Sequence, residues 1–136
     1  MENNIALAEP PLLLGERNHP FLRRVAAAAM DRAPEVARLL LEELDRADLV
    51  SEAELPDDVV TIDSFVTYQI QSTGAINTIQ LVLPPRADLA TMRISIVSGI
   101  GAALIGLRTG QRIAWELGHR QQVLNVLRVS RSHDLM

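Results

Sequence analysis

The chain of 136 residues has room for one domain, or for a compact domain with a small helical appendage, and its 48% hydrophobic residues can form an ordinary core. It has no cysteine, which excludes disulfides, thiolate nucleophiles and cysteine-based zinc sites. Residues 1–56 have six Arg and eleven Asp or Glu, which gives a charge of −5. Residues 57–136 have seven Arg and six Asp or Glu, which gives a charge of +1. Neither part is therefore basic enough to bind nucleic acid by itself.

Two amphipathic helices are predicted after a loosely packed lead-in over residues 1–18. From Pro20 onward, apolar side chains recur at spacings of three and four, which is typical of a helix with one buried face. Pro34 ends this helix and begins a second one over about residues 34–47, because proline suits a first helical turn but not a helix interior. Helices joined by so short a turn pack antiparallel, so we expect a short helical hairpin.

The hydrophobic period changes from 3.6 to 2 after a linker at residues 52–56, which indicates strands. Strands are predicted at about residues 59–72, 79–83, 93–97, 113–117 and 122–130. One short helix is predicted at residues 101–107. Such a set forms an α+β domain. Tyr68 and Trp115 lie at alternating apolar positions and are expected in its core. We place the lead-in and hairpin in residues 1–54 and the sheet domain in residues 55–136.

No catalytic residue, cofactor site or metal site is predicted. Gly99 and Gly101 stand between a strand and a helix, as in dinucleotide sites, but Leu104 occupies the place of the third glycine. The three histidines have no second ligand at helical or hairpin spacing. The acidic run from 42 to 48 is typical of a solvated helix face. We therefore expect a protein that is not an enzyme.

The sequence gives no sign of export or of a membrane anchor. No apolar run approaches the roughly 20 residues that span a bilayer. The N-terminus lacks the basic flank of a signal peptide. We expect a cytoplasmic protein that contacts no membrane.

Two blocks of the sequence resemble a known family. Residues 40–47, followed by residues 55–64, are similar to the junction in bacterial regulators of nucleoside diphosphate kinase (Rnk). Residues 101–110, followed by residues 113–117, are similar to the C-terminal domain that those regulators share with the transcription elongation factors GreA and GreB. The resemblance covers roughly residues 36–130.

This resemblance implies an FKBP-like domain that docks on RNA polymerase near its secondary channel, with the helical hairpin directed at the channel. In the Gre factors, acids at the hairpin tip help to hold a metal in the polymerase active site, and Asp31 and Glu35 flank the corresponding turn here. Helical arms of a dozen residues extend only roughly 18 Å. We therefore expect no stimulation of transcript cleavage. The sequence departs from the family pattern in two turns, at Gly118-His119-Arg120 and at Gln111, where an acid is common.

The leading hypothesis is a transcription regulator without a cofactor that contacts RNA polymerase through Ser98, Gly99, Ile100 and Gly101. Ile100 is expected on a glycine-flanked loop, where an apolar side chain is difficult to bury within the fold and is available to a partner. Ordinary packing of Ile100 is the alternative interpretation.

Two other functions are compatible with the sequence. An FKBP-like fold suggests a peptidyl-prolyl isomerase, although fold alone does not establish function and 3% aromatic residues leave few side chains to line a proline pocket. An interaction module that self-associates through its leucine-rich hairpin is the third hypothesis. The sequence predicts no oligomeric state.

Overall fold

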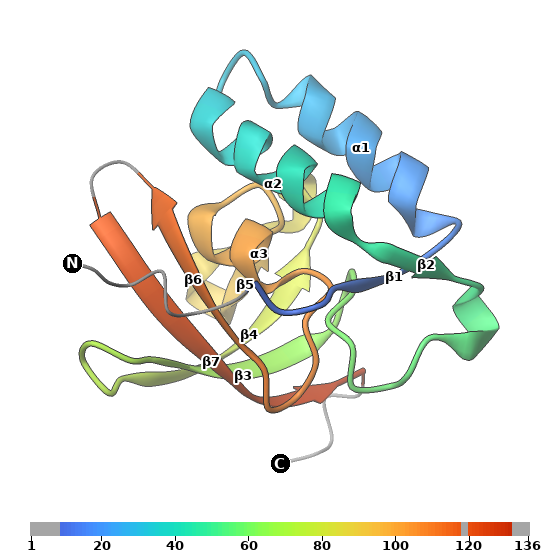
Figure 1. Cartoon of the computed structure of the whole chain (residues 1–136). Coiled ribbons are helices and arrows are strands. Elements are labelled where there is room, and N and C mark those ends of the chain that lie inside the picture. The colour runs from blue at the N-terminus through green and yellow to red at the C-terminus, as the bar shows by residue number, and fades with distance from the viewer. Residues whose placement is uncertain (1–8, 118–119, 132–136) are drawn as a thin grey trace.

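A curved five-stranded sheet forms one side of the structure, and three helices lie over one of its faces (Figure 1). These elements lie within residues 9–117 and 120–131, which the computed structural model describes. The strands of this sheet are β3 (Phe65–Ile70), β4 (Ile76–Val82), β5 (Arg93–Ser95), β6 (Arg112–Leu117) and β7 (Arg120–Ser130), in the order β5-β4-β3-β7-β6. β4 and β5 pair in parallel, and the other neighbours pair antiparallel. The predicted α+β class is confirmed.

Alternation of side chains along the strands gives the sheet one buried face. Val66 and Tyr68 of β3 are buried, as are Ile79 and Leu81 of β4, because every second residue points to the same side. The strand predicted over residues 59–72 is shorter than expected. Residues 59 and 60 pair with residues 106–108 across the fold instead of continuing β3.

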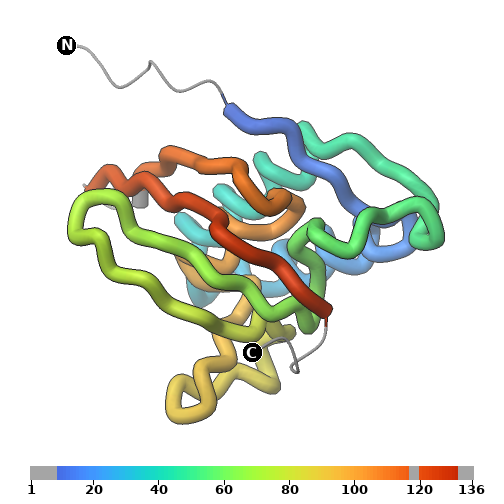
Figure 2. The backbone as a smooth tube through the Cα atoms, turned by 90° about the horizontal axis from the view of Figure 1, so that it is seen from below, coloured from blue at the N-terminus to red at the C-terminus, as the bar shows by residue number. Residues whose placement is uncertain are grey.

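The N-terminal segment is held in a second, two-stranded sheet. β1 (Leu13–Gly15) pairs in parallel with β2 (Asp48–Val50), and the two segments, blue and green, run side by side in Figure 2. Leu12 and Leu14 are buried in the core. The predicted loose lead-in is therefore wrong for its described part. β1 could not be predicted, because a strand of three residues is too short to show a hydrophobic period. Its partner, β2, comes only after both helices in the sequence.

The helices α1 (Asn18–Ala28) and α2 (Pro34–Arg46) lie side by side and contact each other. Pro34 occupies the first turn of α2, as predicted. Arg23 and Asp45 form an ion pair between the two helices. The apolar faces of both helices turn into the core, where the buried side chains are Leu22, Ala26, Ala37, Leu40 and Leu44.

The third helix, α3 (Gly99–Leu104), joins the helical pair to the sheet. It contacts α2 on one side and β5 and β6 on the other. Its close approach to the sheet requires Gly101, because a Cβ atom there would overlap the carbonyl oxygen of Ser95 and lie 2.9 Å from the Cα of Ile96. Side chains of α1, α2, α3 and the sheet form one continuous hydrophobic cluster. The helical pair therefore shares a core with the sheet.

The N-terminus of α1 is capped by Glu52, which is distant in sequence and lies in the 3₁₀ turn Glu52–Glu54 after β2. Neither the residue that precedes α1 nor any acid in its first turn caps the helix. The Glu52 carboxylate instead accepts the backbone N–H groups of Arg17 at 3.1 Å and Asn18 at 3.2 Å. Gly15 leaves room for it, since a Cβ there would overlap this carboxylate.

We predict that Glu52→Ala lowers the free energy of unfolding by about 1–2 kcal/mol, because the first N–H groups of α1 lose their acceptor. Urea denaturation measures the change. The control is Glu54→Ala, which removes an exposed carboxylate from the same 3₁₀ turn and should change the stability by less than about 0.5 kcal/mol. Equal effects of the two substitutions would contradict the capping role.

Candidate functional site

An apolar cleft lies beside the start of α3. Its volume is about 420 Å³, within the roughly 300–1,000 Å³ of pockets that bind ligands or side chains. Aliphatic and aromatic side chains from four strands and α3 form most of its wall: Ile70, Ile94, Ile100, Trp115 and Leu124. The remaining lining residues are Ser98, Gly99, Arg120 and Gln122. The arrangement suits an apolar group entering from outside, with polar contacts at a few fixed points.

Ser98 sets the start of α3 and hence one wall of the cleft. Its Oγ accepts the backbone N–H of Gly101 at 3.0 Å and donates to the carbonyl of Ser95 at 2.7 Å. The helix therefore begins at Gly99, two residues before the predicted start. The expectation of a glycine-flanked loop around Ile100 is wrong, because Ile100 lies in the first turn of α3 and packs partly against the core.

Three of the four residues predicted to bind a partner lie together at this cleft. Ser98, Gly99 and Ile100 line it, whereas Gly101 is buried against the sheet and supports the wall from behind. Their part in binding stays a prediction. Periodicity alone did not reveal the cleft, because its other walls come from strands that are distant in sequence.

Trp115 and Gln122 face each other across β6 and β7. Trp115 was expected in the core but lies at the cleft wall, half-buried. Within residues 9–117 and 120–131, the indole Nε1 of Trp115 and the amide Oε1 of Gln122 are buried and have no hydrogen-bond partner. Such groups are uncommon in folded proteins, and here they lie at the contact between β6 and β7.

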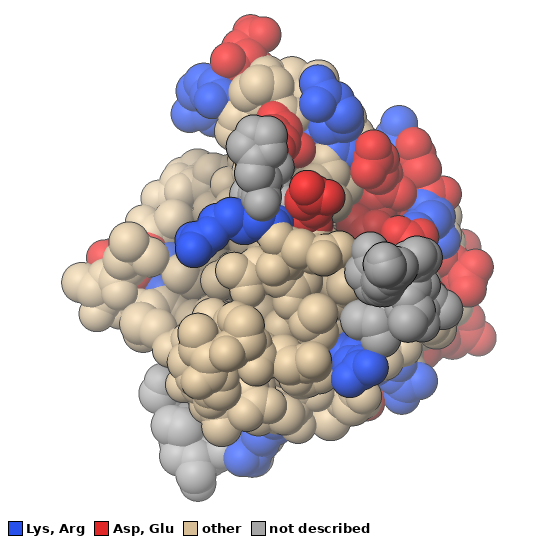
Figure 3. All heavy atoms as spheres, turned by 60° about the vertical axis from the view of Figure 1, so that its left-hand side comes forward, with Lys and Arg blue, Asp and Glu red and all other residues tan. Residues whose placement is uncertain are grey.

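Asp31 and Glu35 lie apart from the cleft, at the connection between α1 and α2. Asp31 is exposed in the turn, and Glu35 is exposed in the first turn of α2. Among the described residues, no group of three or more acids or histidines is placed to hold a metal ion. In the face of the molecule that Figure 3 shows, the centre is largely uncharged and acidic side chains gather along one side.

Glu43, expected on a solvated helix face, is buried beside Arg46. The guanidinium donates to both carboxylate oxygens of Glu43, at 2.8 and 3.0 Å, and to the carbonyl of Pro10 at 2.6 Å. Burial by itself lowers the pKa of Arg46, but its hydrogen bond to Glu43 and the charges of Glu43 and Glu9 outweigh burial and raise it. The pair therefore ties the N-terminal segment to α2.

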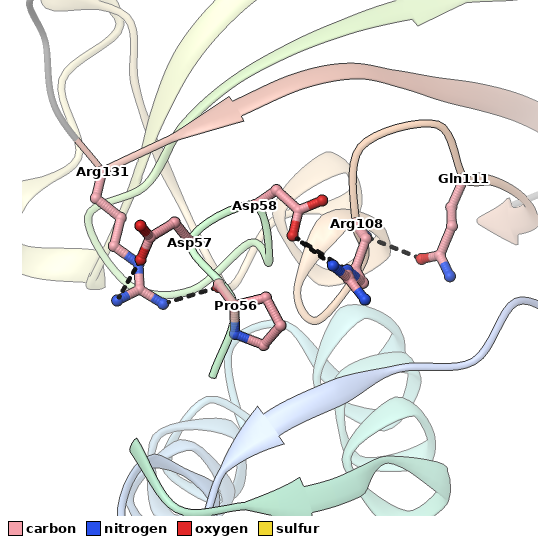
Figure 4. A network of polar contacts seen from close by, with 6 residues as sticks. All are labelled: Pro56, Asp57, Asp58, Arg108, Gln111 and Arg131. Carbon is pink, nitrogen blue, oxygen red and sulfur yellow. Dashed lines mark hydrogen bonds and ion pairs between the residues drawn. The ribbon is translucent and has the colours of Figure 1, made fainter. Parts of the chain in front are cut away.

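A polar seam joins the segment before β3 to the loop after α3 (Figure 4). Arg108 donates to Asp58 Oδ1 through Nε at 3.1 Å and Nη2 at 2.9 Å. The amide oxygen of Gln111 accepts the backbone N–H of Arg108 at 2.8 Å, so this departure from the family pattern keeps an oxygen acceptor in the turn. Arg131 donates to the carbonyl of Pro56 at 3.1 Å. The departure at Gly118 and His119 lies outside the described residues.

Comparison with known proteins identifies a family that covers the C-terminal part of the chain. Residues 55–131 match the family model described as "Transcription elongation factor, GreA/GreB, C-term". Over 82 residues the chain is 42% identical to the regulator of nucleoside diphosphate kinase of Escherichia coli K12, covering 60% of each protein. Over 90 residues it is 30% identical to the transcription elongation factor GreA of Christiangramia forsetii, covering 66% of this chain and 57% of that one. The chain thus spans about 60% of the length of these relatives.

A solved structure agrees with the family match. A prokaryotic transcription elongation factor GreA/GreB from Nitrosomonas europaea superposes with a TM-score of 0.69 at 28% identity, covering 90% of this chain and 99% of that one. The chain belongs to the GreA/GreB C-terminal family, and the resemblance to Rnk and the Gre factors is confirmed. No described helix has both the length and the apolar character needed to cross a bilayer.

We predict that Asp58→Ala costs about 0.5–1 kcal/mol of stability, because Arg108 loses the acceptor of two hydrogen bonds at a partly exposed site. Asp57→Ala is the matched control. The side chain of Asp57 is 98% exposed and 3.9 Å from Arg131, so its removal should change little. Thermal unfolding of the two variants measures both effects. Equal stabilities of the two variants would show that the hydrogen bonds between Asp58 and Arg108 do not stabilise the fold.

Proposed function

We propose that this protein regulates transcription by binding RNA polymerase near the entrance of its secondary channel, with the cleft beside α3 as the contact. The match of residues 55–131 to the GreA/GreB C-terminal family carries the proposal. The cleft supports it, because it combines an apolar wall with Ser98, Gly99 and Ile100 at the start of α3. Apolar pockets of this kind receive the anchor side chains that dominate protein interfaces.

We assign separate roles to residues 1–54 and residues 55–136. The family match begins at residue 55, which supports a contact domain starting there. We regard this domain as FKBP-like, on the basis of a curved, largely antiparallel sheet with one short helix across it. The preceding helices form a short antiparallel hairpin that blocks, or competes for, the channel entrance.

The length of the helices favours blocking over delivery of acids to the polymerase active site. α1 has 11 residues and α2 has 13, which correspond to about 16–20 Å. Leu40 and Leu44 fasten α2 to the core, so the hairpin extends little beyond the body. Asp31 and Glu35 at its turn therefore stay near the surface of the domain. No stimulation of transcript cleavage and no enzymatic reaction are assigned to this chain.

The other functions considered from the sequence have less support. The relatives are regulators and transcription factors, which does not favour a prolyl isomerase. Self-association through the leucines of the helices is disfavoured, because Leu40 and Leu44 are already buried within the chain.

We predict that Ile100→Asp weakens binding to core RNA polymerase at least tenfold, about 1.4 kcal/mol, because a carboxylate replaces an apolar wall of the contact. Fluorescence anisotropy of the labelled protein measures the affinity. The matched control is Ile76→Asp, which introduces the same charge at a 58% exposed isoleucine of β4 outside the cleft and should bind like the wild type. Wild-type affinity of Ile100→Asp would remove the proposed contact.

A further inference from the structure

A second, smaller hollow beside β5 shares part of its wall with the cleft. This hollow has a volume of about 290 Å³, and Ile94 and Ser98 line both cavities. The two adjoining cavities, which lie on either side of Ile94 and Ser98 and include Trp115 at one end and Leu89 at the other, are called the groove below. Leu89 is 77% exposed and belongs to the segment of residues 84–92, which extends beyond the body of the molecule in Figure 2. Two adjoining cavities suit a segment of chain with more than one contact, rather than a single side chain.

Each of the two cavities has an arginine in its wall. Arg120 lines the cleft and Arg93 lines the smaller hollow. Within the described part of the chain, neither guanidinium forms an ion pair, whereas Arg23, Arg46, Arg86 and Arg108 each pair with an acid. The single acid that lines the groove, Asp88, accepts the backbone N–H of Ala90 at 3.1 Å and caps its own turn. With two arginines and one acid in its wall, the groove carries a net positive charge on a protein of net charge −4.

We propose that the groove receives a surface segment of RNA polymerase in which an apolar side chain is flanked by acidic residues. The apolar side chain enters the cleft between Ile100 and Trp115, and Arg120 and Arg93 pair with the flanking carboxylates. This inference rests on the proposed binding to polymerase and specifies the chemistry of the partner. Apolar burial supplies most of the affinity, and the arginines select an acidic partner over a basic one.

The affinity of charge-reversal variants for core polymerase tests the acidic character of the partner. Arg120→Glu is expected to weaken binding at least fivefold, because it sets like charges against each other. Arg128→Glu, with the same change at an exposed position of β7 outside the groove, should stay within twofold of the wild type. Ile70→Phe, which fills part of the cleft and preserves an apolar strand residue, should weaken binding as well.

Synthetic peptides test the same site without polymerase, because Trp115 is the sole tryptophan of the chain and reports on the cleft by fluorescence. An acidic peptide with one central leucine should shift the Trp115 emission. The same peptide with serine for leucine, or with lysines for the acids, should not.

The outcomes separate this inference from the proposed function. If wild type binds polymerase and Ile100→Asp does not, but Arg120→Glu and Ile70→Phe bind normally, the inference is overturned and the proposed function stands. Equal binding of the acidic and the lysine peptide also overturns it. If the wild type does not bind polymerase, the proposed function itself fails.

Discussion

The close packing of α3 between α2 and the sheet is the constraint on which the rest of the structure depends. Gly101 allows the backbone of α3 to lie against Ser95 and Ile96, and no larger residue fits that contact. On its other side α3 meets α2, whose Leu40 and Leu44 belong to the same hydrophobic cluster as the sheet. One short helix therefore fixes the helical pair and the sheet relative to each other.

The same constraint shapes the cleft. With α3 held close to β5, the cap formed by Ser98 places Ile100 in the wall of the cleft that Trp115 and Leu124 also line. The anchored helices limit how far Asp31 and Glu35 reach. We therefore propose that this member of the GreA/GreB C-terminal family acts through its contact surface and through obstruction near it, rather than by delivering acids into the polymerase.

Much of the fold was predictable from local patterns, and the site was predictable only in part. The helical spacing of apolar residues, together with Pro34, predicted the two long helices. The alternation of apolar and polar residues predicted the strands. The β1–β2 pair could not be predicted, because it joins short segments separated by both helices. Gly99 indicated a turn, although the Ser98 cap makes it helical. The unpaired polar atoms of Trp115 and Gln122 depend on tertiary contacts that no sequence pattern encodes.

Equilibrium unfolding in urea, followed by two probes, tests most directly whether helices and sheet form one packed body. Far-ultraviolet circular dichroism follows mainly α1 and α2, and the fluorescence of Trp115 follows the sheet and the cleft. A shared core predicts that the two transitions coincide at one midpoint. Loss of helical signal at a lower urea concentration, with the Trp115 emission still native, would show that the helices are separable from the sheet and contradict the account.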